Sequence, residues 1–202
     1  ACQIGTILNE EIINYSFVEK KHNSKSFSIL VLGGSQGAEI FGRIIPSVIK
    51  MIKDKGYDIE INQQCIEKQK NSLVEFYNKN NIKNNIFNFT SNILDLISSS
   101  DLAISRCGAS TIAELVQTLT PFIAVPYPHS VDNHQYLNAK YYEEKGCCWV
   151  LEQDNFNSIN LFNIIMKILN DRRKLENVRK SMKKNNNKDV YDKVENVIKE
   201  LI

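Results

Sequence analysis

Short apolar runs alternate along the chain with longer segments in which apolar residues recur every three or four positions. The first run, Phe27 to Leu32, contains β-branched residues and stops at two glycines, which is typical of a buried strand. The segment from Ala38 to Ile52 has the apolar spacing of an amphipathic helix. The same alternation predicts further strands at 57–61, 86–90, 101–105, 122–125 and 148–151, and helices at 67–79, 92–99, 110–118, 132–145 and 158–169.

This alternation predicts an α/β fold, with a parallel sheet covered by helices on both faces. Because strand–helix–strand crossovers are right-handed, we expect a doubly wound, Rossmann-like sheet. We expect three parts: an N-terminal segment at 1–26 with a short helix at 9–15, the Rossmann-like domain at 27–184, and a C-terminal helix at 185–202. The domain ends in a basic helix at 171–184, and the last helix carries an apolar stripe that needs a partner surface.

Composition excludes several classes of protein. The 202 residues are 43% hydrophobic, which is enough for a sizeable core, and a net charge of +2 is too small to make nucleic acid the expected partner. The five cysteines form no C-x-x-C pair, which gives zinc or dithiol sites no support and fits a reducing compartment. No apolar stretch approaches the ~20 residues that span a bilayer, and no signal peptide is recognisable.

Three segments carry candidate chemistry, and the first is Gly33 to Ala38, which joins a strand to a helix. Glycines let the backbone approach a phosphate closely, and the following helix offers free N–H groups and the positive end of its dipole. The hydroxyl of Ser35 can donate a further hydrogen bond. The segment lacks the Lys-Ser/Thr of a P-loop and is not G-x-G-x-x-G. It therefore indicates either a phosphate-binding turn or an ordinary tight turn.

The second segment, Asp101 to Glu114, places small hydroxyl residues at the start of a predicted helix. Ser110 and Thr111 can cap the free N–H groups of that helix or share them with a diphosphate. Glu114 falls about one turn into the helix, where a carboxylate can accept both hydroxyls of a ribose. The alternative for Glu114 is favourable placement near a helix N-terminus. Beside the Gly33 segment, these features favour a nucleotide.

The third segment, Pro126 to Gln135, is a polar loop between a strand and a helix. Asn133, His134 and Gln135 can form hydrogen bonds with sugar hydroxyls. His129 and His134 suggest acid–base chemistry. The sequence supplies no second member of a catalytic dyad, so we interpret both as loop or capping histidines.

In this order, the three segments resemble motifs in the C-terminal domain of the MurG family of N-acetylglucosamine transferases. The segment Gly33–Ala38 is similar to G-G-S-Q-G-A, Arg106–Glu114 to R-S/G-G-A-x-T-x-x-E, and Asp132–Ala139 to D-N-H-Q-x-x-N-A. The similarity extends over about residues 27 to 152. It implies a glycosyltransferase of the two-domain GT-B type, whose C-terminal half holds UDP-N-acetylglucosamine (UDP-GlcNAc).

The resemblance also assigns substrate-binding roles to residues of this chain. The diphosphate is expected to contact Ser35, with Gln36 nearby, and the helix-terminal amides of Ala109, Ser110 and Thr111. The backbone of Thr90 is expected to contact the uracil, and Glu114 the ribose. Gln135 is expected to contact GlcNAc, with Asn133 as a weaker candidate. The family needs no metal for transfer and no Asp-x-Asp motif is present, so we expect neither a metal nor another cofactor.

The function implied by the resemblance is inverting transfer of GlcNAc from UDP-GlcNAc to a lipid-linked muramyl-pentapeptide. This step converts lipid I to lipid II in peptidoglycan synthesis, and so serves cell wall biogenesis, cell shape and cell division. We expect this chain to lack the family's N-terminal domain, which supplies the proposed base and a membrane-facing apolar patch. We therefore expect no catalytic residue in this chain, so that it binds the donor without turning it over. The expected partners are UDP-GlcNAc, an N-terminal acceptor domain and, through that domain, the lipid-linked acceptor at the cytoplasmic face of the inner membrane.

One departure from the family and two alternatives remain. Gly5 stands where the family has an arginine that reaches the diphosphate, and loss of such a charge-assisted contact costs roughly 1.5–3 kcal/mol. The first alternative is a UDP-sugar transferase with another acceptor, or a UDP-GlcNAc epimerase. The second is a non-catalytic, partner-dependent UDP-GlcNAc-binding subunit that docks through the apolar stripe at 190–201.

Overall fold

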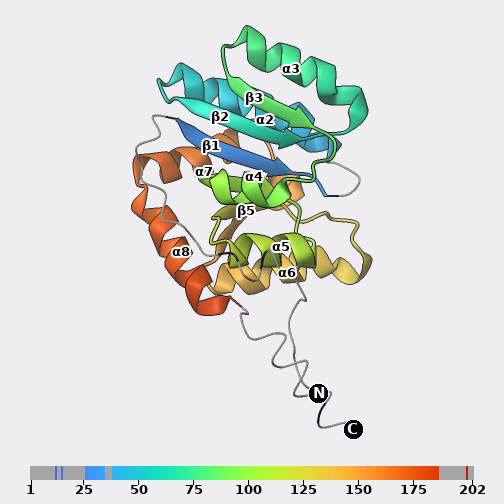
Figure 1. Cartoon of the computed structure of the whole chain (residues 1–202), viewed down its shortest axis with the longest axis vertical. Helices are drawn as coiled ribbons and strands as arrows, with labels where there is room; N and C mark the ends of the chain where they lie inside the picture. The colour runs from blue at the N-terminus through green and yellow to red at the C-terminus, as the bar shows by residue number, and fades with distance from the viewer. Residues whose placement is uncertain (1–11, 13–14, 16–25, 35–37, 187–198, 200–202) are drawn as a thin grey trace.

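The computed structural model describes residues 12, 15, 26–34, 38–186 and 199, and its central feature is a six-stranded parallel sheet. The strands are β1 (Phe27–Leu32), β2 (Ile59–Gln64), β3 (Lys83–Phe87), β4 (Leu102–Ser105), β5 (Phe122–Ala124) and β6 (Cys148–Val150). They lie in the order β3-β2-β1-β4-β5-β6, with every neighbouring pair parallel (Figure 1). The predicted doubly wound sheet is confirmed, and its chain order reverses between β1 and β4.

Helices cover both faces of this sheet. Residues of α2 (Glu39–Asp54), α3 (Lys70–Lys79) and α7 (Ser158–Asn170) pack in one buried cluster. Residues of α4 (Ile93–Ser99), α5 (Ala109–Gln117) and α6 (His134–Glu144) pack in the other, and α8 (Arg173–Asn185) contributes to both. Short 3-10 turns lie at η1 (Glu67–Gln69), η2 (Val131–Asn133) and η3 (Gln153–Asn155).

The central strand β1 is buried on both sides. Ile29 and Val31 belong to the cluster that holds α2, whereas Leu30 and Leu32 belong to the cluster that holds α5. A strand covered by helices on both faces needs apolar residues at every position, which explains its continuous apolar run.

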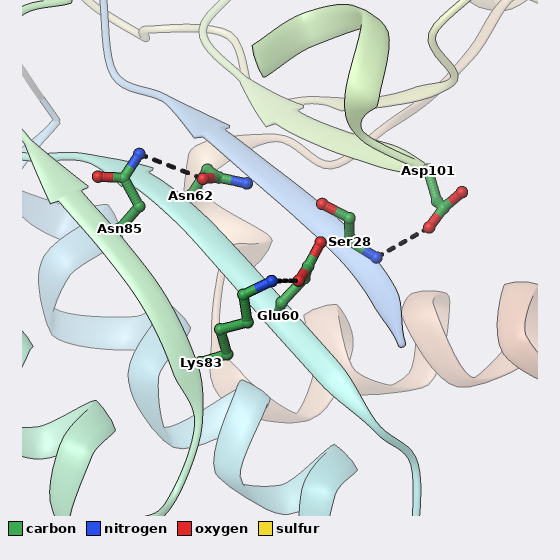
Figure 2. Close-up of polar contacts among 6 residues, drawn as sticks. All are labelled: Ser28, Glu60, Asn62, Lys83, Asn85 and Asp101. Carbon is green, nitrogen blue, oxygen red and sulfur yellow. Dashed lines mark hydrogen bonds and ion pairs between the residues drawn. The ribbon is translucent and has the colours of Figure 1, made fainter. Parts of the chain in front are cut away.

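The two strands beyond β1 carry polar side chains on one face. Lys83 donates to the carboxylate of Glu60 at 2.7 Å, and the side-chain amide of Asn85 donates to Asn62 at 3.3 Å (Figure 2). On the opposite face of β2, Ile59 and Ile61 are buried. These polar positions explain why the predicted bounds were wrong here: β2 runs three residues past the predicted end at 61, and β3 begins three residues before the predicted start at 86.

Other predicted elements between 27 and 184 are present with small shifts at their ends. The predicted helix 132–145 divides into η2 and α6, because Asp132 and Asn133 adopt left-handed backbone angles (φ of 49° and 55°). Of the predicted helix at 9–15 only residues 12 and 15 are described, and of the predicted C-terminal helix at 185–202 only residues 185, 186 and 199, so most of the N-terminal and C-terminal parts lie outside the described residues. Among the described helices, none has the length and apolar character needed to span a membrane.

Candidate functional site

The loops that follow β1 and β4 leave the sheet side by side. Leu32 and Ser105, the last residues of the two strands, are paired in register. The backbone N–H of Arg106 then donates to the carbonyl of Leu32 at 3.0 Å, which extends the pairing into the loop. In open α/β sheets this reversal point, at the carboxyl ends of the strands, is where ligands bind.

A cleft of about 640 Å³ opens at this point, within the ~300–1,000 Å³ typical of small-molecule sites. It is lined by Gly33, Gly34, Ala38, Glu39, Ile40, Arg43, Ile66, Arg106, Gly108, Ser110, Thr111, Tyr127, Gln135 and Gln153. Both glycine turns singled out in the sequence therefore line one cleft. Ser35 and Gln36, predicted to contact the diphosphate, lie outside the described residues.

The side chain of Gln64 holds the first glycine turn. Its carbonyl oxygen accepts a hydrogen bond from the backbone N–H of Gly33 at 3.1 Å, and its amide nitrogen donates to the backbone carbonyl of Asn88 at 3.2 Å. The next residue of the turn, Gly34, has a φ of +81°, a conformation that L side chains rarely adopt. One amide thus joins the turn after β1 to the loop after β3.

Thr90 lies in that loop, three residues beyond the end of β3 rather than at the strand end that was predicted. Its hydroxyl accepts a hydrogen bond from the backbone N–H of Asn92 at 3.1 Å, immediately before α4. This bond uses one acceptor site of the hydroxyl, and the predicted contact with uracil concerns the Thr90 backbone. Thr90 is not part of the cleft lining.

The second glycine turn leads directly into α5. This helix begins after Gly108, and no side chain of a described residue caps it. Ser110 and Thr111 line the cleft, so the capping alternative for their hydroxyls is not what the structure shows. The first backbone bond of the helix runs from the N–H of Ile112 to the carbonyl of Gly108. The N–H groups of Ala109, Ser110 and Thr111 therefore have no acceptor within the helix, and an anion can accept hydrogen bonds from them.

Glu114 lies further along α5 and is half-buried. No described residue forms a hydrogen bond with its carboxylate, and burial raises the pKa of the group. Its side chain is not part of the cleft lining. The structure therefore presents an unpartnered carboxyl group on the helix that opens at the cleft.

Arg106 is buried beside the second turn, with 8% of its surface exposed. Nη1 donates to the carbonyls of Val125 and Pro126 at 3.2 Å, and Nη2 donates to the side-chain oxygen of Gln153 at 2.6 Å. The guanidinium also lies 5.0 Å from the ring centre of Phe41 and 5.3 Å from that of Tyr127. Burial lowers the pKa of Arg106, but a guanidinium keeps its charge in proteins.

Two side chains of α6 form hydrogen bonds with the backbone of Cys107, the residue before Gly108. The side-chain oxygen of Gln135 accepts from the N–H groups of Cys107 and Tyr127, both at 3.0 Å. The side-chain nitrogen of Asn138 donates to the carbonyl of Cys107 at 3.1 Å. The amide nitrogen of Gln135 has no bonded partner among the described residues, and Gln135 lines the cleft.

The remaining sequence candidates lie at the edge of this arrangement. Asn133 is exposed and lines a separate hollow of about 210 Å³ rather than the cleft. His134 is exposed, and its Nδ1 lies 2.8 Å from the carbonyl of Val131, as a histidine with a local backbone role would. His129 lies against the ring of Tyr127. Among the described residues, no group of three or more His, Cys, Asp or Glu side chains could hold a metal ion.

Sequence reasoning gave no role to Gln64, Gln153, Asn138 or Arg106. Arg106 and Asn138 lie within the segments that resemble the family motifs, so their position in those motifs could have identified them. Gln64 was missed because the predicted strand ended at 61, before the position that lies beside the β1 turn.

Comparisons with known proteins identify a matching family model and relatives of this chain. The family model described as "Glycosyltransferase family 28 C-terminal domain" matches residues 28–195. A relative from Rickettsia bellii, named UDP-N-acetylglucosamine–N-acetylmuramyl-(pentapeptide) pyrophosphoryl-undecaprenol N-acetylglucosamine transferase, is 36% identical over 202 residues, covering 98% of this chain and 56% of the relative. A relative from Pelagibacter ubique with the same name is 33% identical, covering 91% of this chain and 52% of the relative.

The fold is also found in a solved structure. The crystal structure of Acinetobacter baumannii MurG matches with a TM-score of 0.79 at 24% identity, covering 90% of this chain and 54% of that one. This likeness shows the fold. The chain spans about half the length of the curated relatives it matches.

Proposed function

This chain belongs to the family of glycosyltransferase family 28 C-terminal domains, and we propose that it is the UDP-GlcNAc-binding half of an inverting transferase. The proposed reaction moves GlcNAc to a lipid-linked muramyl-pentapeptide, which makes lipid II from lipid I in peptidoglycan synthesis. The names of the Rickettsia bellii and Pelagibacter ubique relatives support this reaction. The observation that carries the proposal is that the turns after β1 and β4 line one cleft at the reversal point of the sheet.

In the proposed complex, the diphosphate lies between the Gly33–Gly34 turn and the first turn of α5. Backbone N–H groups and the positive helix end favour an anion there, and Ser35 and Gln36 remain predicted contacts. Gln135 would offer its free amide nitrogen to GlcNAc. Because Glu114 and Thr90 lie outside the cleft lining, the ribose and uracil would extend past the cleft, along α5 and toward the loop after β3.

This half would contribute to the chemistry by stabilising the leaving group. Negative charge develops on UDP as the bond to GlcNAc breaks, and fixed donors at the start of α5 are already oriented toward that charge. In this proposal the acceptor, its base and the contact with the cytoplasmic face of the membrane belong to the other half of the transferase. The reaction needs no metal in this proposal.

Calorimetry with the full chain tests the donor. UDP-GlcNAc and UDP should bind, and GDP-mannose should bind at least about tenfold more weakly, because a purine base cannot make the contacts of a uracil. Equal affinity for GDP-mannose, or no binding of either uridine compound by a chain that is folded by circular dichroism, would refute the proposed donor.

The acceptor is tested by adding a separate N-terminal half, taken from the Rickettsia bellii relative. Transfer of radiolabelled GlcNAc to lipid I, and not to a water-soluble sugar acceptor, is the expected result, with no transfer when either half is left out. Transfer only to the water-soluble acceptor would favour another transferase. Conversion of UDP-GlcNAc to a second UDP-sugar would favour an epimerase.

A further inference from the structure

The charges that line the cleft are unevenly compensated. Glu39 forms an ion pair with Lys68 at 3.1 Å. Arg43 is exposed on α2. Arg106, in contrast, is buried, and no described Asp or Glu lies within ion-pair distance of it. The cleft therefore contains a buried cation that has no counter-ion among the described residues.

The partners of Arg106 are all neutral. Three of the five N–H donors of a guanidinium are accounted for by two backbone carbonyls and the side-chain oxygen of Gln153. One N–H of Nη2 and that of Nε have no bonded partner among the described residues. The rings of Phe41 and Tyr127 favour a cation but carry no net charge. The guanidinium is thus held in one orientation while its charge stays uncompensated.

A buried charge without a counter-ion is unfavourable for folding, since hydrogen bonds and aromatic rings offset only part of the desolvation that an opposite charge in good geometry would offset further. A glutamate at position 153 would supply that charge, because Nη2 already lies 2.6 Å from the side-chain oxygen of Gln153. The chain has the neutral amide instead. The neighbouring carboxylates Glu152 and Asp154 are exposed, and neither is paired with Arg106. The counter-charge is therefore left for a ligand to bring.

We propose that Arg106 is the diphosphate-binding cation of this cleft, held in place by Gln153 and the strand-end carbonyls and kept without an internal counter-ion so that its charge acts on the ligand. This inference rests on the proposed function, because it needs a nucleoside diphosphate in the cleft. It adds a positive side chain to the backbone donors of the two turns, from a residue that lies two positions before Gly108 of the second turn and lines the same cleft.

The substitution Gln153→Glu tests this directly, because it leaves Arg106 in place and neutralises its charge. UDP affinity should fall about tenfold or more, the size expected for a lost charge-assisted contact. Uridine affinity, measured by ligand-observed NMR, should change less than twofold, and the melting temperature should stay the same or rise. The substitution Gln153→Leu removes the anchor without adding a charge, and should weaken UDP binding less than Gln153→Glu does.

Two further variants complete the test. Asn163→Asp, on an exposed position of α7, adds the same charge elsewhere and should leave UDP affinity within twofold of the wild type. Arg106→Gln should reproduce the loss of UDP binding, with uridine binding kept. UDP binding unchanged by Gln153→Glu, or UDP and uridine weakened equally, would overturn the inference. Failure of the wild-type chain to bind UDP at all would instead refute the proposed function, and this inference with it.

Discussion

The side-chain oxygen of Gln64 accepts a hydrogen bond from the backbone N–H of Gly33 at 3.1 Å. The nitrogen of the same amide donates to the carbonyl of Asn88. These two loops are the ones assigned to the diphosphate and, through Thr90, to the uracil. A single side chain at the end of β2 therefore sets the spacing between the two ends of the proposed nucleotide site.

Replacing Gln64 with leucine should weaken both binding and folding. The N–H of Gly33 would lose its acceptor, at a cost of about 1–3 kcal/mol, and the two loops would no longer be tied together. We expect UDP-GlcNAc affinity to fall about tenfold by calorimetry, and the urea midpoint of unfolding to decrease. Asn62→Leu, two residues earlier on the same face of β2, is the matched control and should leave affinity unchanged. Equal loss of affinity in both variants would contradict the spacing role.

Gln135→Leu should destabilise the fold more than most substitutions in the cleft. The side-chain oxygen of Gln135 is the acceptor for two backbone N–H groups, those of Cys107 and Tyr127, and each unsatisfied donor costs about 1–3 kcal/mol. Gln135→Glu keeps the acceptor oxygen and should recover most of this stability in urea unfolding. Both variants should lose the preference for UDP-GlcNAc over UDP, since both lack the amide nitrogen. A leucine variant as stable as the wild type would show that the two N–H groups find other partners.

Gly34→Ala should strain the first turn. The φ of +81° is unfavourable for a residue with a Cβ by roughly 1–2 kcal/mol. Apart from the chain neighbours, no described residue has an atom within 4 Å of the added Cβ, so the backbone conformation sets the cost. Gly56→Ala is the matched control, because its φ is +89° and, apart from the chain neighbours, its added Cβ also meets no atom of a described residue within 4 Å. Both variants should lose similar stability in thermal unfolding. Only Gly34→Ala should also lose UDP affinity, by about tenfold, as the turn moves away from the phosphates.

The sequence predicted the parts of the fold that depend on continuous apolar patterns. The central strand β1 is apolar at every position because both of its faces are buried, and the two glycine turns follow strands of this kind. The carboxyl end of β2 was missed because Asn62 and Gln64 are polar, and their suitability for a strand depends on which residues face them. The bond from Gly33 to Gln64 could not be predicted, since it depends on the register between β1 and β2, two strands about 30 residues apart in the chain.

Ionised Glu114 lowers the stability of the fold, and the same carboxylate is proposed to bind the ribose. Burial raises its pKa, and no described residue forms a hydrogen bond with its carboxylate. A raised pKa means that the folded state favours the protonated acid, so ionisation lowers stability as pH rises through the pKa values of the unfolded and folded states. The variant Glu114→Gln should therefore melt about 1–3 °C higher than the wild type at pH 7, a small rise because the side chain is partly exposed and solvent screens its charge. The difference should shrink as pH falls through the raised pKa of the folded state and should vanish below about 4, where an ordinary glutamate is protonated in the unfolded chain as well.

The same substitution should weaken the nucleotide site. A carboxylate accepts hydrogen bonds from both ribose hydroxyls, whereas an amide has one oxygen for this purpose, so UDP affinity should fall about tenfold at pH 7, the scale of a lost charge-assisted contact. In the wild type, affinity should decline on acidification at a higher pH than an ordinary glutamate would cause, because the protonated acid loses acceptor capacity. Glu75→Gln, at an exposed position of α3, should change neither the melting temperature nor the pH profile of binding. If Glu114→Gln stabilised the fold and bound UDP with wild-type affinity, the carboxyl group would lower stability without contacting the nucleotide. Another residue would then have to bind the ribose.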